Sequence, residues 1–597
     1  MTSRRDFLLS GLVLLGGCSA WDSLTFRSQS PEEPEEKKDL DIRMVGDLAV
    51  PYNMHLTSLE AVGLVTRLKG TGSDPRPSAY RDELINEMQI RGVKNPNQIL
   101  ASRDVSLVLA RGIVRPGLQK GDHFDLELRV PSQSETTSLR GGYLLQVHLK
   151  ELQVQNNTVR NGHTYALAEG PVLVDPSADP QKDHLLACRG RVLGGGIALK
   201  SRPLALVLKN EQRSVFNAAK IETAINRRFH SFEKGVKVGM AKAKDDHYIQ
   251  LDLHPRYKEN VQRYMAVVRA VALRESETER MDRVTLLERQ LLDPLSASRA
   301  ALQLEAMGKP GLEVLQRGLG SRDPEVRFYA AEAMAYLDDT RATAALAEAA
   351  RNVPAFRVFA LAALSALNDM GAAEKLRELM QLPSAETRYG AFRALWTMSP
   401  DDPGVRGEML GGFGYHVLDC VGPPMVHVTR SRRAEIVLFG REQYLQGAFH
   451  LEAGNRILVS CRGGNEVTVS RYAPDEADQK RLVSTRVDDV VRAVVELGGA
   501  YPDVVQALQQ AKAAGALPSR FEVDALPEAG RTYERFADDK KKGEPPATSP
   551  VPDLFNKQEG KPASTETDTN EPGVDEAAEA EKPGPVKAFF AKMKGEK

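Results

Sequence analysis

Hydrophobic and polar positions change their spacing along the chain. Between residues 42 and 273 several short segments alternate apolar and polar side chains, most clearly residues 124–130, and this period of two predicts half-buried strands. Other segments of the same region place apolar residues three or four positions apart, as Ala218, Ile221 and Ile225 do, which predicts amphipathic helices. We therefore predict an α+β region here.

Residues 293–400 follow a different pattern, rich in Ala and Leu with helical spacing. Pro294, Pro324 and Pro354 lie 30 residues apart, and Arg327 and Arg357 keep the same distance. Proline fits the first position of a helix, and an Asp before it can accept hydrogen bonds from the free N–H groups of the first turn. The shared period predicts short HEAT-like helical-hairpin repeats, that is, an all-α solenoid. An irregular Ala-rich bundle is the alternative.

The β pattern returns after the repeats. Residues 434–440, 456–460 and 467–469 are predicted strands, and two helices follow, the first patterned by Val490 and Val494. From about residue 538 the chain is dominated by Pro, Glu, Lys, Ser and Thr, a composition that cannot bury enough apolar surface to fold. Residues 538–597 are therefore predicted to be a disordered tail.

The N-terminal residues resemble an export signal. Arg4 and Arg5 precede an apolar run that is too short to span a bilayer, as in twin-arginine signals. Cys18 ends a segment similar to a lipobox, so we expect residues 1–17 to be removed and Cys18 to carry a lipid. Ser19, rather than Asp, favours the outer membrane. An ordinary signal peptide with a chance Cys is the alternative. Residues 18–41 are then a flexible tether.

Length, charge and cysteine content narrow the function further. A chain of 597 residues is too long for one core, and a formal net charge of -1 provides no general basic surface for nucleic acid. The four Cys are far apart and include no C-x-x-C pair, so neither a zinc site nor a redox dithiol is indicated. In an oxidising compartment, a disulfide between Cys420 and Cys461 that leaves Cys188 free is one arrangement the sequence allows.

Motifs of catalysis are missing from the sequence. It contains no G-x-S-x-G, H-E-x-x-H or P-loop, and no G-x-G-x-x-G after a predicted strand. Asp245, Asp246 and His247 are the nearest approach to a cluster of ionisable groups, and we interpret them as a solvated turn. We therefore predict no catalytic residue, no cofactor and no metal site.

The most informative residues are Ser138-Leu139-Arg140-Gly141-Gly142, with Arg115-Pro116-Gly117 before them. In this order and spacing they resemble the bacterial flagellar P-ring protein family. The resemblance extends over residues 42–273, stops, and resumes over residues 434–526, where residues 503–517 are similar to the C-terminal signature of the family. It predicts ring-building domains in two parts, residues 42–275 and 410–530, separated by the helical repeats of residues 290–405.

The resemblance implies a structural role in motility. P-ring proteins form a closed homo-oligomeric ring in the periplasm, which surrounds the flagellar rod as a bushing at the peptidoglycan layer, next to the L-ring protein. Arg115, Arg140, Gly141 and Gly142 are candidates for the ring interface or for locking a loop, and ordinary turns are the alternative.

Three features depart from the family: the helical block, the lipid anchor and the long tail. They keep a second function open, a lipid-anchored periplasmic scaffold outside the flagellum that binds an unidentified protein through its HEAT-like repeats. The presence of flagellar genes beside this gene would favour the ring over the scaffold.

Overall fold

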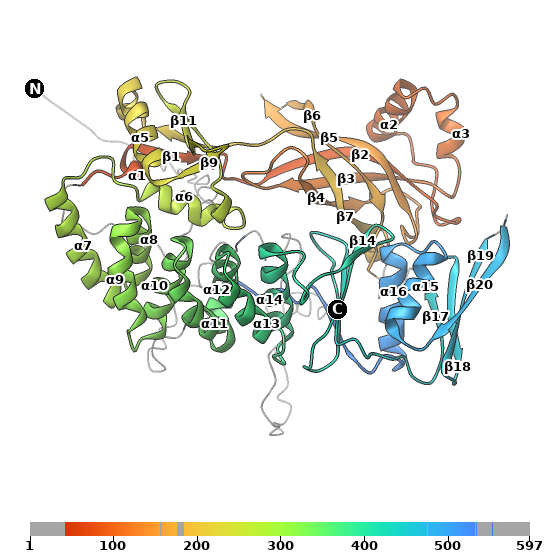
Figure 1. Ribbon diagram of the computed structural model, residues 1–597. Helices are drawn as coiled ribbons and strands as arrows, with labels where there is room; N and C mark the ends of the chain where they lie inside the picture. The colour runs from red at the N-terminus through yellow and green to blue at the C-terminus, as the bar shows by residue number, and fades with distance from the viewer. Residues whose placement is uncertain are drawn as a thin grey trace, which may run out of the picture. The chain divides into compact units, whose positions relative to one another are not determined.

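The structure is a computed structural model that describes residues 42–155, 158–175, 184–473 and 476–531, together with Tyr533 and Pro552. The chain combines several sheets with many helices (Figure 1), so the predicted α+β class is confirmed. The predicted export signal with Arg4, Arg5 and Cys18 lies outside the described residues. So does the predicted tail, apart from Pro552.

Six strands close into a barrel in the order β2-β3-β4-β7-β6-β5, and all neighbours in it are antiparallel. Leu59, Leu126 and Leu144 are fully buried in the hydrophobic cluster of this barrel. Closure pairs the strand edges and makes a stiff support for the connecting loops. The elements are β2 (Thr57–Thr66), α2 (Ala79–Ile90), α3 (Pro96–Leu100), β3 (Ser106–Val114), β4 (His123–Arg129), β5 (Tyr143–Gln155), β6 (Thr158–Pro171), α4 (His184–Ala187) and β7 (Arg189–Ala198).

A second, four-stranded antiparallel sheet has the order β1-β8-β12-β11. Helix α5 packs against it and buries Ala218, Ile221 and Ile225, as their spacing predicts. The elements are α1 (Val45–Leu48), β1 (Ala49–Tyr52), β8 (Leu204–Leu208), α5 (Val215–Arg228), β9 (His230–Glu233), β10 (Val236–Gly239), β11 (Ala241–Ala243), β12 (Tyr248–Leu251) and α6 (Val261–Arg269).

Eight helices follow, and they contact one another in two series. Helices α8, α10, α12 and α14 each contact the next member of that series, and α9, α11 and α13 pack between them. Their bounds are α7 (Glu277–Leu292), α8 (Ala297–Met307), α9 (Leu312–Leu319), α10 (Pro324–Tyr336), α11 (Thr343–Asn352), α12 (Pro354–Ala366), α13 (Met370–Leu379) and α14 (Ala385–Met398).

The helix starts agree with the proline pattern at two positions out of three. Pro324 and Pro354 are the first residues of α10 and α12, and the Asp323 carboxylate accepts from the first turn of α10, at 2.8 Å from the Glu325 nitrogen. Pro294 was expected to start a helix, and that expectation is wrong. It lies in a turn, and α8 begins at Ala297.

The periodic arginines explain the 30-residue spacing. The side chain of Arg327 donates to the Ser321 carbonyl just after α9, at 3.1 Å. Arg357 donates in the same way to Ala350 near the end of α11, at 3.0 Å. Arg388, one residue late in the repeat, donates to Met380 after α13, also at 3.0 Å. Each arginine thus satisfies a carbonyl that the end of the preceding helix leaves free.

The C-terminal region contains two sheets and two helices. The first sheet is mixed, in the order β13-β14-β16-β15-β21, and the second is the antiparallel β17-β18-β19-β20. The predicted strands and the valine-patterned helix are all present. The elements are β13 (Glu408–Leu410), β14 (Phe413–Leu418), β15 (Met425–Val428), β16 (Glu435–Phe439), β17 (Ala448–Ala453), β18 (Ile457–Arg462), β19 (Glu466–Ala473), β20 (Glu476–Ser484), α15 (Val487–Glu496), α16 (Tyr501–Ala513) and β21 (Arg520–Val523).

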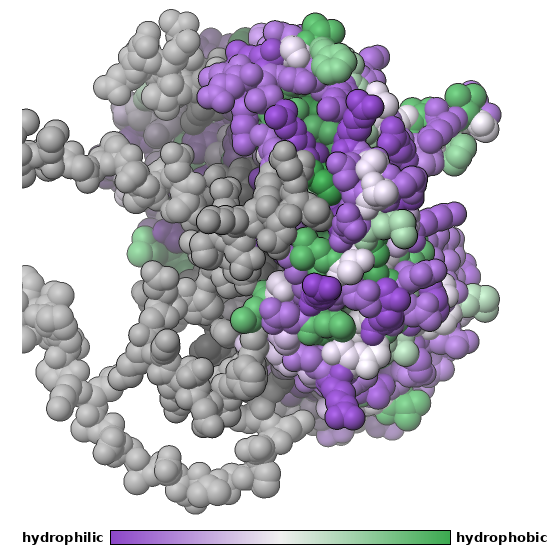
Figure 2. Space-filling model, turned by 90° about the vertical axis from the view of Figure 1, so that its left-hand side faces the viewer, coloured by the Kyte–Doolittle hydropathy of each residue, from purple (hydrophilic) through white to green (hydrophobic). Residues whose placement is uncertain are grey.

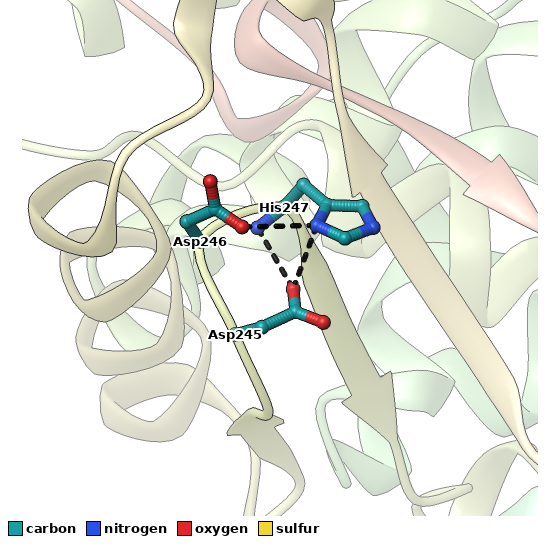
Figure 3. A group of neighbouring side chains, drawn as sticks. All are labelled: Asp245, Asp246 and His247. Atoms are coloured by element: carbon teal, nitrogen blue, oxygen red, sulfur yellow. Dashed lines mark hydrogen bonds and ion pairs between the residues drawn. The ribbon is translucent and has the colours of Figure 1, made fainter.

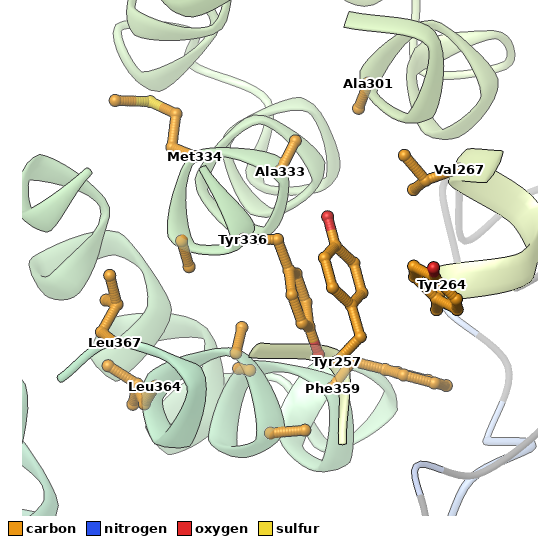
Figure 4. Close-up of a cluster of buried hydrophobic side chains, with 14 of the residues drawn as sticks. Tyr257, Tyr264, Val267, Ala301, Ala333, Met334, Tyr336, Phe359, Leu364 and Leu367 are labelled. Atoms are coloured by element: carbon orange, nitrogen blue, oxygen red, sulfur yellow. The ribbon is translucent and has the colours of Figure 1, made fainter. Parts of the chain in front are cut away.

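One continuous hydrophobic cluster joins the second sheet to the helices. Figure 4 shows Tyr257, Tyr264 and Val267 facing side chains of α8 and α10. The rings of Tyr257 and Tyr336 stack, with their centroids 4.8 Å apart. The helices therefore do not form a separate body but share a core with the region before them.

Three buried charges lie in this shared core. Arg263 of α6 binds Glu305 of α8 at 2.5 Å and Glu332 of α10 at 2.7 Å, and the side chains are 0–2% exposed. The Tyr257 hydroxyl donates to the second oxygen of Glu305 at 2.5 Å. Buried charges of this kind are tolerated only while they are paired and hydrogen-bonded.

A similar buried pair fixes the other end of the helices. Arg393 of α14 binds Glu435 of β16 at 2.8 Å, and the Tyr389 hydroxyl donates to the other Glu435 oxygen at 2.8 Å. The Tyr389 ring stacks on His427 of β15, with centroids 3.6 Å apart. Burial lowers the pKa of His427 to about 3, against the opposing attraction of Glu435.

We expect Arg263→Met to lower the free energy of unfolding by about 3–5 kcal/mol, because the apolar stem is retained while two buried carboxylates lose their cation. Urea denaturation followed by circular dichroism measures the change. Arg351→Met is the matched control: its pair with Glu378 is half-exposed on both sides, and the expected loss is about 1 kcal/mol or less. A loss at Arg263 no larger than that of the control would contradict this role for the network.

We expect stability to fall as the pH drops below 6.5, partly through His427. Its pKa is lower in the folded state than in the unfolded state, so between about pH 6.5 and 3 the unfolded chain binds the extra proton and acid favours unfolding. Urea denaturation at several pH values should give a shallower pH dependence for His427→Phe, by up to about 1.4 kcal/mol per pH unit. Parallel curves would refute the assignment. His254, with a pKa lowered by burial to about 4, contributes equally in both chains.

Candidate functional site

The loop that enters β5, residues 136–142, is called here the Arg140 loop. Leu139 is fully buried in the barrel cluster, and its backbone N–H donates to the Ala187 carbonyl at 3.0 Å. The Thr71 hydroxyl donates to the Ser138 carbonyl at 2.9 Å. The loop is therefore anchored by the burial of Leu139 in the barrel core and by hydrogen bonds to α4 and to the loop after β2.

The two glycines of the Arg140 loop occupy their positions for different physical reasons. Gly141 has φ +72°, a conformation that side chains with a Cβ rarely adopt. Gly142 lies against the barrel core, where a Cβ would approach Val65 Cγ1 to 2.5 Å. Glycine therefore suits both positions, Gly141 because of its positive φ and Gly142 because of the close approach.

Arg140 contacts segments far away in the sequence. Its guanidinium donates to the Asp175 carbonyl at 3.4 Å, and its own carbonyl accepts from the Asn455 side chain at 3.4 Å. Asn455 belongs to the turn between β17 and β18, and its carbonyl also accepts from Lys69. The Arg140 loop thus joins the barrel to the C-terminal region within one chain.

A buried carboxylate makes a second connection between these regions. Asp125 of β4 is only 1% exposed. One of its oxygens accepts from the Gly194 N–H at 2.7 Å and the other from the Arg432 N–H. Burial raises the pKa of Asp125, while the two N–H donors and the nearby Arg191 and Arg115 oppose that rise. The carboxylate holds the 429–435 loop on the barrel.

Further charged contacts surround Asp125. The Arg191 side chain donates to the Arg430 carbonyl at 3.2 Å and pairs with Glu127 at 3.2 Å. The Arg430 guanidinium lies 3.6 Å from the Asp175 carboxylate. Asp175 is therefore shared by Arg140 and Arg430, so the two connections form one polar junction.

Arg115 lies on the same side of the barrel. It follows β3 and precedes the Pro116-Gly117 turn, in which Gly117 has φ +75°. A Cβ on Gly117 would contact Val261 at 3.7 Å, so this turn lies against the region of α6. The four residues predicted as ring-interface or loop-lock candidates are thus all found at turns that contact other parts of the same chain.

Asp125, Asn455 and Arg432 were not predicted as site residues. The alternation of residues 124–130 places Asp125 on the outward, polar face of β4, and nothing in the sequence indicates that another region covers that face. Asn455 lies in an ordinary Gly-Asn turn. Predicting these residues would have required knowing that the barrel and the C-terminal region pack against each other.

The structure does not form the disulfide considered above. Cys188, Cys420 and Cys461 are all free thiols. Cys461 belongs to the cluster of the C-terminal sheets, whereas Cys420 packs against the cluster of the helices. The two sulfurs therefore belong to different cores.

Asp245, Asp246 and His247 form the turn between β11 and β12 (Figure 3). Asp245 accepts from the backbone N–H groups of His247 and Tyr248, at 2.9 and 2.6 Å, and these bonds lower its pKa. The His247 ring lies 3.0 Å from Asp246. The acidic groups thus serve the hairpin turn, in agreement with the interpretation from sequence.

Within the described residues, no helix has both the length and the apolar character needed to cross a membrane. On the face shown in Figure 2, hydrophilic residues predominate and hydrophobic ones occur in small scattered groups.

The predicted site residues hold loops of the chain in place, which is a structural task. Comparison with known proteins points to a specific structural family: residues 45–290 match the family described as flagellar P-ring protein. The match covers the barrel and the second sheet, and for these residues it confirms the resemblance to the P-ring family seen in the sequence. The predicted second part, residues 434–526, lies outside the matched range.

Individual relatives agree with the family. The flagellar P-ring protein of Geobacter metallireducens is 28% identical over 257 residues, which cover 41% of this chain and 64% of the relative. That of Nitrosospira multiformis is 28% identical over 247 residues, 39% of this chain and 60% of the relative. That of Sinorhizobium medicae is 31% identical over 178 residues, 28% and 45%. The chain thus spans less than two thirds of these relatives.

We expect Asp125→Ala to loosen the 429–435 loop from the barrel, because two part-buried N–H groups lose their acceptor at about 1–2 kcal/mol each. Hydrogen exchange at the Arg432 amide should become faster, and the free energy of unfolding should fall by about 2–4 kcal/mol. Glu127→Ala, on the same strand but partly exposed, should change stability by about 1 kcal/mol or less. Unchanged protection of the Arg432 amide would rule out this role for Asp125.

Proposed function

We propose that the protein is a structural subunit of a periplasmic ring similar to the flagellar P ring. The observation that carries the proposal is the family match of residues 45–290, which covers the barrel and the second sheet. The relatives named above are themselves called flagellar P-ring proteins. They support the ring over a scaffold unrelated to the flagellum.

The mechanism we propose is passive. Copies of the chain associate through a heterologous interface whose rotation closes into a ring. The ring surrounds the rod at the peptidoglycan layer, next to the L-ring protein, and lets the rod turn without gripping it. A bushing must resist load, and the polar junction around Asp125 and Asp175 supports this by stiffening each subunit. No catalytic step is required of any residue.

The predicted site residues fit this role in one of two ways. The contacts of Arg140, Gly141 and Gly142 inside one chain support a loop lock, and the turn after Arg115 is of the same kind. A contact between neighbouring subunits at Arg115 or Arg140 is a further proposal, since both side chains remain half-exposed.

The helices after residue 290 form, in our proposal, a HEAT-like solenoid inserted between two P-ring-like parts. The two contact series of the helices and the repeated arginine caps support it. The proposed parts are residues 42–275, 290–405 and 410–530, followed by a disordered tail, residues 538–597. The solenoid would bind a further protein component at the ring.

Export and anchoring are proposed from the sequence. Arg4 and Arg5 would direct the chain to the twin-arginine pathway, and a lipid on Cys18 would hold the ring subunit at the outer membrane. The tether of residues 18–41 would then allow the folded region to reach the peptidoglycan.

A clean deletion of the gene tests the proposed function. We expect loss of swimming, and electron micrographs of purified basal bodies that lack the periplasmic ring. Complementation with the wild-type gene should restore both, which controls for effects on neighbouring genes. Normal swimming with intact rings would refute the proposal.

A further inference from the structure

The segment after β21 lies along the helices. Residues 524–531 and Tyr533, called here the strap, form neither helix nor strand, yet each of them is buried or half-buried. A surface segment without secondary structure normally exposes much of its length to water. The burial of this one indicates that the helices hold it.

The strap leaves the C-terminal sheet through two backbone contacts. The Asp524 N–H donates to the Val428 carbonyl at 3.0 Å, and the Ala525 N–H donates to the His427 Nε2 at 3.0 Å. Leu526, 5% exposed, then enters the hydrophobic cluster of the helices. These contacts set the direction in which the strap runs.

The side chains that follow are received by successive helices. Pro527 packs on Gly390 of α14, where a Cβ would come within 2.7 Å of the Pro527 ring. Arg531 binds Glu386, also of α14, at 2.6 Å. The other oxygen of Glu386 is held by Arg357 of α12 at 3.1 Å, which orients the carboxylate.

Aromatic stacking ends the series. The Tyr533 ring lies on Phe356 of α12, with centroids 4.7 Å apart. Phe356 in turn stacks on Phe328 of α10 at 4.3 Å, with the two rings nearly parallel. The strap therefore contacts side chains of α14 and α12, and Phe328 of α10 supports the Phe356 ring on which Tyr533 stacks.

We propose that Gly390, Glu386, Phe356 and Phe328 form a peptide-binding surface for an extended segment with a proline, an arginine four residues later and an aromatic residue two further on. Its occupant is the strap of the same chain. A glycine that makes room for a proline, an oriented carboxylate for a guanidinium and a stacked aromatic pair together recognise side chains, not only a path of the backbone. While the strap is bound, this surface is closed to other proteins.

A full-length chain with a released strap tests the proposal. Arg531→Glu combined with Tyr533→Ala removes the ion pair with Glu386 and the stacking on Phe356, and it leaves the binding surface intact. A fluorescein-labelled peptide of residues 523–535 serves as the probe, and fluorescence anisotropy measures its binding. We expect the released chain to bind it at least about tenfold more tightly than the wild-type chain, because the strap of the wild type competes for the surface.

The matched control is the same peptide with Arg531→Glu and Tyr533→Ala, which should bind neither chain. Equal affinity of the two chains for the wild-type peptide, or equal binding of both peptides, would overturn the proposal. Thermal melting of the released chain confirms that it is folded.

A second variant identifies the occupant. Gly390→Cys with Pro527→Cys should give a disulfide within one chain on oxidation, because a Cβ at position 390 would lie 2.7 Å from Pro527 Cγ, which places the two Cβ atoms within the reach of about 4 Å that a disulfide needs. A disulfide-linked dimer would instead place the strap of a second copy on the surface and overturn occupation by the same chain. Neither measurement depends on motility, so failure of the proposed ring function would leave the outcome unaffected.

Discussion

The pairing of buried charges is the constraint on which the rest of this structure depends. Arg263, Glu305 and Glu332 come from three helices, and ionic groups buried in this way are stable only while they remain paired and hydrogen-bonded. Such a group tolerates little displacement, so it fixes the position of α8 and α10 against α6. Arg393 and Glu435 impose the same condition at the far end of the helices. Buried ion pairs thus hold the helices in place at both ends, and apolar packing holds them between these ends.

The barrel and the C-terminal region are joined by weaker and more exposed chemistry. Asp125 is buried, but its partners are backbone N–H groups, and the other contacts near it are partly exposed arginines. Backbone donors at a buried carboxylate give direction without requiring a second buried charge. The chain therefore combines a buried charge network at Arg263 with a more exposed polar junction at Asp125, and each of them restrains the regions that it joins.

Much of this architecture could be predicted from local patterns. Alternating residues identified β4, helical spacing identified α5, and the proline period located α10 and α12. Failures occurred where a distant segment decided the outcome. Asp293 precedes Pro294, as at a helix start, but Asp293 accepts hydrogen bonds from Leu295 and Ser296 that form a turn before α8 begins. Asp125 has the pattern of a solvated position, and only the docking of the 429–435 loop buries it. A periodic pattern predicts the secondary structure of its own segment, but it does not predict which distant segments will contact that segment.

The periodic arginines have two functions: they stabilise the helical repeat, and one of them orients a carboxylate that binds the strap. Arg327, Arg357 and Arg388 each cap the preceding helix, which is a local function and explains their spacing. Arg357 has a second contact, with Glu386, which Arg531 of the strap shares. Arg357 therefore caps the preceding helix and also orients the Glu386 carboxylate on the surface of the helices. Because that carboxylate is held by the repeat itself, it can receive a guanidinium from an extended segment without losing its own support. The same arrangement would accept a segment of another protein, and the strap competes with such a segment for the carboxylate.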